Sequence, residues 1–326
     1  MSGADREGSF LTSDNPFLSR PKKAQIAPAE ADAAVEHFIR ESLSENTRAA
    51  YRADLAHFTG WGGVVPATAD LVARYLAYHA DKLAPASLAR RVATLSKVHA
   101  ANEWPNPCQS EVVRATLRGI KRVRGTAQDQ ARPLLREDLF LILDALSDDA
   151  RAQRDRALLL IGWAGGFRSS ELVGLHWSDV DEVREGLVLH LVRSKTDQTG
   201  QGRKIGIPLG RTRHCPVVAL AAWRKASGGD GGPIFRPVDR HGNMQPDSLR
   251  SDAVSTILRD RLTGANIDAK GYSGHSLRAG LVTSAIKAGV PTYKVRAQTG
   301  HASDLMLSRY VRDAGMFDGN AAAALL

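Results

Sequence analysis

Cysteine is scarce in this chain of 326 residues, in which only Cys108 and Cys215 occur. Neither lies in a C-x-x-C motif, so the sequence offers no disulfide framework and no thiolate zinc site, and we expect both to be reduced packing residues. Long apolar runs are also missing, and the N-terminus has no basic-then-apolar signal pattern. We therefore expect a soluble intracellular protein with no membrane contact.

Acidic residues are in deficit. The chain has 44 Lys and Arg against 35 Asp and Glu, which gives a formal net charge of +9 and a pI near 9.8. A balance this basic favours a polyanionic partner such as nucleic acid. The hydrophobic share of 43% and the charged share of 24% are those of an ordinary globular protein. A chain of this length usually forms two domains.

The N-terminal part predicts an arm followed by a helical domain. Residues 1–25 are polar and show no sustained period, which predicts a disordered arm. Residues 26–125 carry five helical patterns, with Ser44 and Thr68 as candidate N-caps of the second and third. Tyr51, Tyr75 and Tyr78 fall on predicted apolar faces. We expect these three tyrosines to belong to the core of this domain.

The fifth helical pattern, at residues 110–125, is strongly basic. One side carries Val113, Leu117 and Ile120. The other side carries Arg114, Arg118, Lys121, Arg122 and Arg124. A basic helix face is often only solvated, but this one directly precedes residues 126–133, a polar stretch typical of an interdomain linker. We interpret the basic side as a DNA-contacting surface, because a cationic face near a hinge suits a clamp around a rod of negative charge.

Residues 134–326 predict a second, mostly helical domain. Two wide apolar helical patterns open it. The period then changes to that of strands at residues 186–195 and 204–210, with the turn-rich residues 196–203 between them, which predicts a hairpin. Helical patterns resume at residues 216–227, 246–262, 276–290, 291–300 and 303–313. The predicted fold is mainly α, of the α+β class, with a small antiparallel sheet in the second domain.

Residues able to bind an anion gather in three short motifs of this second domain. "GFRSSEL" contains Arg168 and Glu171, and "SGHSLRAG" contains His275 and Arg278, which share one face of a helix at a spacing of three. "TGHASDLMLSRYV" contains His301 and Tyr310, and Lys195 lies at the tip of the predicted hairpin. The planar fork of arginine matches phosphate, and histidine can hold or release a proton near neutral pH.

In order and spacing these motifs resemble those of the tyrosine recombinase, or phage integrase, family, and most of all its Cre-like members. The resemblance is strong from about Leu134 to Tyr310 and only architectural before that. It implies that Arg168 and Arg278 bind the phosphate and that Glu171 supports Arg168. It also implies that Lys195 is the hairpin lysine and Tyr310 the nucleophile. His275 matches the histidine of the H-x-x-R box, and His301 stands where Cre-like members have tryptophan.

The resemblance further implies the activity. We expect a site-specific DNA recombinase that cuts and rejoins strands through a 3′-phosphotyrosyl intermediate and a Holliday junction, as a homotetramer on double-stranded DNA with a specific recombination site. Lys195 is expected to be the general acid and His275 a base or orienting group, while His301 joins the arginines in stabilising the transition state. No metal, ATP or other cofactor is required, because the cations are side chains. The two domains are expected to form a C-shaped DNA clamp in the cytoplasm of a bacterium.

Several alternatives remain open in the sequence. Tyr272 and Tyr293 lie near the motifs and rival Tyr310 as nucleophile, and Lys204, beyond the hairpin turn, rivals Lys195 as general acid. A type IB topoisomerase or telomere resolvase would use the same chemistry and differ only in its product. A DNA-binding module that has lost activity is the alternative from another class, and the presence of every catalytic position argues against it.

Overall fold

The structure is a computed structural model that describes residues 34–35, 37–38, 41–126, 130–191, 202–229 and 231–314, with backbone alone at residues 309 and 311–314. The chain divides after residue 128 into an N-terminal and a C-terminal compact unit. This division falls inside the predicted linker 126–133, whereas the predicted arm, residues 1–25, lies outside the described residues. None of the described helices is long and apolar enough to cross a membrane.

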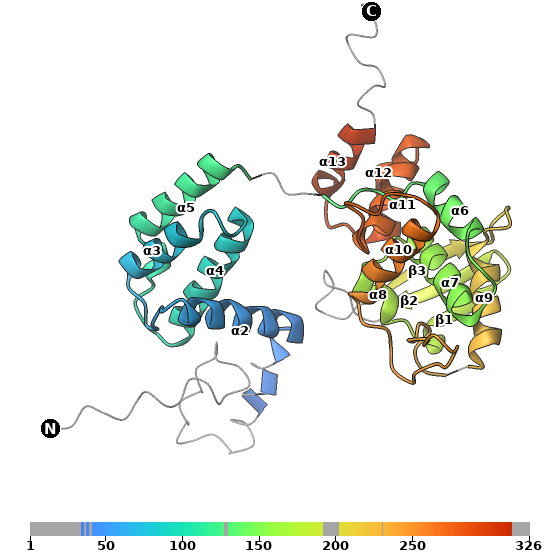
Figure 1. Ribbon diagram of the computed structural model, residues 1–326, viewed down its shortest axis with the longest axis horizontal. Coiled ribbons are helices and arrows are strands. Elements are labelled where there is room, and N and C mark those ends of the chain that lie inside the picture. The colour runs from blue at the N-terminus through green and yellow to red at the C-terminus, as the bar shows by residue number, and fades with distance from the viewer. Residues whose placement is uncertain are drawn as a thin grey trace, which may run out of the picture. The chain divides into compact units, whose positions relative to one another are not determined.

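The N-terminal unit is helical (Figure 1). Its elements are α2 (Glu45–Gly60), α3 (Ala69–His79), α4 (Pro85–Ala101), the short 3-10 helix η1 (Pro107–Gln109) and α5 (Glu111–Arg124). Ser44 and Thr68 are confirmed as N-caps, because each hydroxyl accepts a hydrogen bond of 3.3 Å from the backbone N–H three residues later. The helix expected at residues 27–43 lies largely outside the described residues.

The core of this unit confirms part of the tyrosine prediction. Tyr75 is fully buried against Phe58, and Tyr51 is half-buried. The prediction is wrong for Tyr78, whose ring remains 55% exposed and lies under the Lys82 ammonium, 3.8 Å from the ring centre. The position falls at the rim of the apolar stripe, where the periodicity of a helix does not separate core from edge.

The C-terminal unit is mostly helical around a three-stranded sheet (Figure 1), and the predicted fold class is confirmed. Its helices are α6 (Arg136–Asp144), α7 (Ala150–Gly165), α8 (Ser169–Val173), α9 (Pro216–Ser227), α10 (Ala253–Gly264), α11 (His275–Lys287), α12 (Thr292–Thr299) and α13 (Asp304–Ala314), with the 3-10 helix η2 (Trp177–Asp179). Its strands are β1 (Val180–Val183), β2 (Gly186–Leu191) and β3 (Arg203–Pro208), antiparallel and in that order across the sheet.

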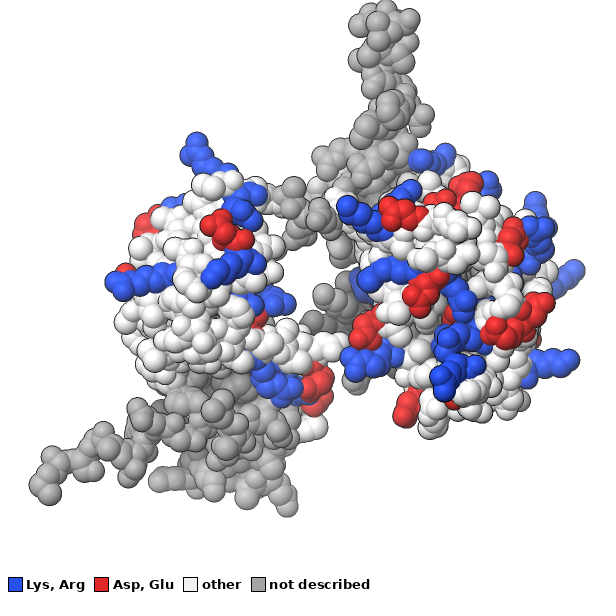
Figure 2. All heavy atoms as spheres, viewed as in Figure 1, with Lys and Arg blue, Asp and Glu red and all other residues white. Residues whose placement is uncertain are grey.

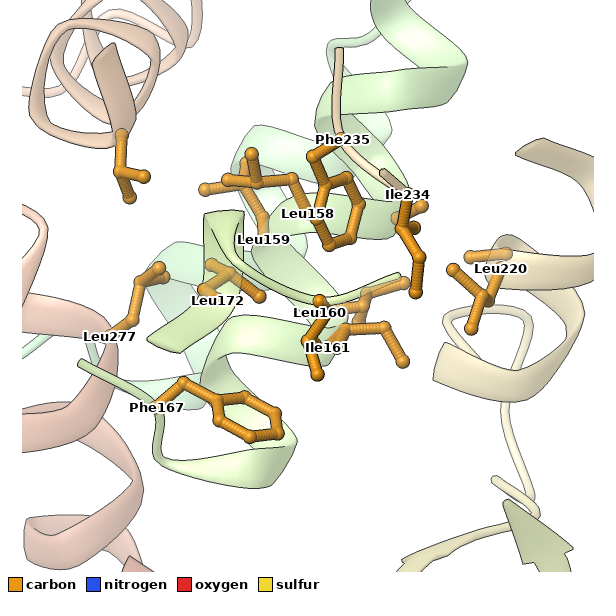
Figure 3. Packing of buried hydrophobic residues seen from close by; sticks show 14 of the residues in the cluster. Leu158, Leu159, Leu160, Ile161, Phe167, Leu172, Leu220, Ile234, Phe235 and Leu277 are labelled. Carbon is orange, nitrogen blue, oxygen red and sulfur yellow. The ribbon is translucent and has the colours of Figure 1, made fainter. Parts of the chain in front are cut away.

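The core of this unit forms around α7, which is apolar on most sides. Leu158, Leu159 and Ile161 are fully buried, and Figure 3 shows them with Leu172 of α8, Leu220 of α9 and Leu277 of α11. Across the sheet, Leu189 pairs with Ile205 and Leu187 with Ile207, so one face of β2 and β3 joins this core. Cys108 and Cys215 are both free and buried, as expected.

Two elements differ from the prediction. Strand β1 was not predicted, because its sequence "VDEV" is an edge strand with three exposed residues and no apolar alternation. Helix α10 begins at Ala253 and not at residue 246. The backbone N–H of Leu249 instead donates to the Phe235 carbonyl at 2.8 Å, which holds this segment in an irregular loop against the core.

Candidate active site

Arg168 is presented by the sharp turn between α7 and α8. Helix α7 ends at Gly165, and its C-cap Gly166 is in the left-handed conformation, with φ of +59°, where a side chain would be strained. Arg168 then caps α8, and Glu171 in the first turn accepts the Arg168 backbone N–H at 3.0 Å on Oε2. The other oxygen, Oε1, holds Nη1 of the same arginine. Glu171 is buried, so this carboxylate fixes both the backbone and the guanidinium of Arg168.

Arg278 lies on α11 and is buried at the centre of the site, with only 1% of its surface exposed. Its Nη1 donates to the Gly166 carbonyl at 2.7 Å and to the Thr299 carbonyl at 2.6 Å. Burial, followed by the charge of Arg168, lowers the pKa of Arg278 to about 10. Its Nη2 is buried and has no hydrogen-bond acceptor among the described residues. A buried cationic donor without an acceptor marks a place where an anion would be stabilised.

Arg203 is a further arginine of the site and is not among the residues predicted from the sequence. Its Nη1 donates to the Gln298 carbonyl at 3.1 Å, and its Nη2 lies 3.6 Å from Oε2 of Glu171. Both Nε and Nη2 are buried without an acceptor in the described part of the chain. The guanidinium lies against Gly300, where an added Cβ would come within 2.8 Å of Cζ. Glu171 is thus shared by two arginines, Arg168 at the N-cap of α8 and Arg203 on β3.

Strand alternation could have revealed Arg203. The residue is in phase with Ile205 and Ile207, which face the core, whereas Lys204 and Gly206 are exposed on the other face. The turn-rich composition of residues 196–203, with Arg203 as the last of them, hides this phase in the sequence.

The same alternation bears on the two candidate lysines. Lys204 pairs across the sheet with His190, whose Nε2 lies 2.6 Å from Asp181, on the exposed face of the strands. It therefore lies on the face of β3 opposite the one from which Arg203 reaches Glu171. Lys195 lies outside the described residues, so its assignment stays a prediction.

Helix α13 brings Tyr310 to the two histidines. The helix packs on α11 and α12 through Leu307, which is fully buried beside Val282 and Val295. The Tyr310 hydroxyl lies 3.3 Å from Nε2 of His275, and its ring centre lies 6.4 Å from that of His301. The six described residues of the predicted constellation are therefore gathered at one site: Arg168, Glu171, His275, Arg278, His301 and Tyr310.

Both histidines of this site have lowered pKa values, and the shift of His301 is large. Burial, with the charges of Arg278 and Arg168 next, lowers the pKa of His301 to about 3. Desolvation and the same two arginines lower the pKa of His275. Both rings are therefore neutral at pH 7 in this state. An incoming anion would offset the positive field and favour protonation of either ring.

The rival tyrosines occupy different surroundings. Tyr272 is buried, donates its hydroxyl to Asp138 at 3.0 Å, and has a pKa raised to about 12 by burial and by that carboxylate. Tyr293 is 64% exposed on α12. Of these three tyrosines, Tyr310 is the one whose hydroxyl meets a histidine of the site.

The basic face of α5 belongs to the N-terminal unit. Arg114, Arg118, Arg122 and Arg124 are exposed and Lys121 is half-buried. Glu111 pairs with Arg118, and Asp81 lies 3.4 Å from Arg124, so two of these charges have acidic partners. Figure 2 shows Lys and Arg side chains standing out from this unit, with acidic side chains among them.

Comparison with known protein families decides the identity of the chain. Residues 133–315 match the model of the phage integrase family, and residues 36–105 match that of the phage integrase N-terminal SAM-like domain. The chain belongs to the phage integrase family. An integrase/recombinase xerD homolog of Selenomonas ruminantium is 33% identical over 293 residues, which cover 87% of this chain and 86% of that protein. The family resemblance inferred from the sequence is thereby confirmed, and the chain is a tyrosine recombinase acting in site-specific DNA recombination.

Other relatives of this phage integrase family member support the same family assignment. The tyrosine recombinase XerC of Xanthomonas campestris pv. campestris is 31% identical over 210 residues, 60% of each chain. Among solved structures, a lambda integrase (75–356) dimer bound to a COC′ core site matches with a TM-score of 0.60 and 20% identity, covering 87% of this chain and 95% of that one. A lambda integrase tetramer bound to a Holliday junction matches with a TM-score of 0.59 at 20% identity, covering 90% and 83%. At this identity the structures support the fold alone.

Proposed function

We propose that this recombinase cleaves DNA by attack of the Tyr310 hydroxyl on a phosphodiester, forming a 3′-phosphotyrosyl link and releasing a 5′ hydroxyl. The observation that carries the proposal is a cluster of buried guanidinium donors, from Arg203 and Arg278, in the site that also holds Tyr310. Within the described part of the chain these donors have no acceptor. Arg203 lies 3.6 Å from Glu171, and Arg278 donates to the Gly166 carbonyl. Both contacts are made around the turn that presents Arg168. Such an arrangement suits the non-bridging oxygens of a phosphodiester.

Each side chain then has a distinct task. Arg168 and Arg278 stabilise the charge that develops on the non-bridging oxygens, and removing one such donor typically costs about 10²- to 10³-fold in rate. Glu171 orients Arg168. His275 lies within reach of the Tyr310 hydroxyl, so its neutral ring serves as the base or orienting group for that proton. Lys195 protonates the departing 5′ oxygen.

The choice of tyrosine explains reversibility. A phenol with an ordinary pKa of about 10 is a better leaving group than a sugar hydroxyl, so the phosphotyrosyl link conserves the energy of the broken bond. A 5′ hydroxyl from another strand can therefore attack the link and regenerate Tyr310. No metal or nucleotide is needed for this exchange in the proposed mechanism.

We extend the proposal to the assembly. The helical unit, residues 26–125, and the catalytic unit, residues 134–326, would both contact double-stranded DNA, with the basic face of α5 against phosphates. Four protomers on two recombination sites would exchange strands through a Holliday junction. The likeness to a lambda integrase tetramer bound to a Holliday junction supports this arrangement, as does the basic charge of the chain.

A nicked suicide substrate tests the nucleophile. Wild-type protein should become covalently attached to the DNA, whereas Tyr310→Phe should bind the same DNA and form no attachment. Tyr293→Phe is the matched control, since Tyr293 is exposed on α12, and it should attach like wild type. Peptide mapping of the adduct to Tyr272 or Tyr293 would overturn the assignment.

Recombinant products, and not relaxed circles or hairpin ends, distinguish a recombinase from a topoisomerase or telomere resolvase.

A 5′-bridging sulfur substrate tests the general acid. Lys195→Ala should slow cleavage of a normal phosphodiester by about 10²- to 10⁴-fold. The defect should disappear with the sulfur substrate, because a thiolate leaves without a proton. Lys204→Ala should cleave both substrates at the wild-type rate, because Lys204 is on the opposite face of β3 from Arg203. Sulfur rescue of Lys204→Ala alone would transfer the role to Lys204.

A further inference from the structure

Thr299 is the last residue of α12 and is fully buried between two residues of the site. Its carbonyl accepts from Nη1 of Arg278 at 2.6 Å. Its hydroxyl lies 2.7 Å from the Val295 carbonyl and 2.6 Å from Nδ1 of His301. The proposed mechanism assigns no task to this hydroxyl, although both of its hydrogen bonds are short.

The two hydrogen bonds together determine where the protons lie. The Val295 carbonyl can only accept, so a separation of 2.7 Å between two oxygens requires that the Thr299 hydroxyl donates its proton there. A hydroxyl has one proton, so the interaction with His301 requires that the ring nitrogen be the donor. Nδ1 of His301 therefore carries a hydrogen whether the ring is neutral or charged.

We propose that Thr299 is a positioning residue that holds His301 in the tautomer protonated on Nδ1, so that Nε2 is the ring nitrogen that gains and loses a proton. The inference deepens the proposed function of His301 and rests on it. In the neutral ring Nε2 is an acceptor. It must take up a proton from water before it can donate to a non-bridging phosphate oxygen.

The surroundings of His301 bear on when that proton is taken up. The groups that act on the ring from the packed elements are Arg168, Arg203, His275, Arg278 and Tyr310. Burial is the main cause of the lowered pKa of His301, and the charges of the arginines lower it further. A phosphate between these arginines offsets their charge, so proton uptake at Nε2 is coupled to the arrival of the substrate.

The tautomer can be measured without any DNA. Nitrogen-15 NMR of histidine-labelled protein at pH 7, with the signals of His301 assigned by their loss in His301→Gln, distinguishes a protonated Nδ1 from a protonated Nε2. Wild type and Thr299→Ser should both show Nδ1–H, since serine retains the hydroxyl. Thr299→Val has nearly the same shape without the hydroxyl and should switch to Nε2–H, because a buried Nδ1–H would lack an acceptor. A protonated Nε2 in wild type would overturn the proposal, even if neither variant folds.

Cleavage of the suicide substrate supplies the kinetic test. In wild type, His301 donates from Nε2 only when the ring is protonated, so the cleavage rate should fall above the pKa of His301 in the DNA complex. In Thr299→Val the neutral ring can donate from Nε2. The ratio of the Thr299→Val rate to the wild-type rate should therefore rise by up to about tenfold per pH unit above that pKa. The Thr299→Ser ratio should stay constant. A Thr299→Val ratio independent of pH refutes the role of Thr299. If wild type shows Nδ1–H but forms no adduct at Tyr310, the proposed function fails and the tautomer assignment stands.

Discussion

Replacing Glu171 by glutamine tests how the site tolerates its positive charge. Glutamine keeps the shape of the side chain and a carbonyl oxygen that can accept the Arg168 backbone N–H, which Glu171 accepts at 3.0 Å. What disappears is the negative charge shared by Arg168 and Arg203. Arg278, whose pKa Glu171 raises, loses the same compensation. Three arginines would then face one another with no carboxylate among them.

The expected cost follows from burial. Removing one partner of a buried ion pair typically costs about 3 to 5 kcal/mol, because it leaves an uncompensated charge. The Glu171 side chain is only 3% exposed, but those of Arg168 and Arg203 remain 20% and 19% exposed and keep part of their hydration. We therefore expect Glu171→Gln to lower the free energy of unfolding of the C-terminal unit by about 2 to 3 kcal/mol.

Urea unfolding followed by tryptophan fluorescence measures this cost. Trp61 and Trp104 are first replaced by phenylalanine, so that the remaining tryptophans, at positions 163, 177 and 223, report on the C-terminal unit alone. Glu182→Gln is the matched control. Glu182 pairs with Arg224 at 3.1 Å on the surface, with its side chain 67% exposed, and should cost less than about 1 kcal/mol.

Sulfate then separates charge from packing. A dianion bound among the arginines restores the missing negative charge, so sulfate should stabilise Glu171→Gln more than wild type when ionic strength is held constant with chloride. The reasoning is refuted if Glu171→Gln costs no more than Glu182→Gln. It is also refuted if sulfate stabilises both proteins equally.

Other parts of the structure give three further predictions. Gly280→Ala should lower the free energy of unfolding of the C-terminal unit in urea by about 1 to 3 kcal/mol, because the new Cβ would collide with the Leu134 carbonyl, whose carbon would lie at 2.7 Å. The control Gly264→Ala should show no such loss, because no other atom lies within 4 Å of the Cβ it would add. Acidification from pH 6.5 to 5 should lower the free energy of unfolding by up to about 1.4 kcal/mol per pH unit for each histidine involved. The reason is that the pKa values of His214, His275 and His301 are lowered in the folded protein, so the unfolded chain binds more protons in this range. A free energy of unfolding that does not change with pH would contradict this. Replacing Arg114, Arg118, Arg122 and Arg124 together by glutamine should reduce the slope of log affinity for DNA against log salt concentration by about 0.9 for each phosphate that the variant no longer neutralises. The control Arg74→Gln, on α3, should leave this slope unchanged. An equal slope in the two variants would mean that the basic face of α5 is solvated and does not contact DNA.

Spacing in the sequence predicts what is local along the chain, and the family resemblance predicts the distant members of the site, from Arg168 to Tyr310. Ser44 and Thr68 cap helices through the residue three positions later, and Glu171 reaches Arg168 over the same spacing. A helix cap depends on a few residues in a row, so spacing is enough to predict it, whereas the pairing of Glu171 with Arg168 was an implication of the family resemblance. The position of Lys195 was also a matter of local motif, but the residue lies outside the described part of the chain.

What the sequence could not predict depends on tertiary packing. Arg203 belongs to the site only because the end of α12 meets β3, where Gln298 accepts from Arg203 and donates to the carbonyls of Ala164 and Gly206. Strand alternation puts Arg203 on the core-facing side of β3, but no spacing along the chain encodes which residues it meets there. The start of α10 is similar, since the hydrogen bond from Leu249 to Phe235 overrides a local helical pattern.

The same packing explains how Arg278 can be buried with a single carboxylate nearby. Its Nη1 is held by the carbonyls of Gly166 and Thr299, which lie at the C-terminal ends of α7 and α12. Each helix end carries about half a negative charge, so two ends together offset roughly one positive charge. The compensation comes from the backbone and occupies one nitrogen only. Nη2 of Arg278 has no acceptor among the described residues, so in the proposed mechanism it is left for the phosphate, and a cation already in place would stabilise the transition state without reorganisation.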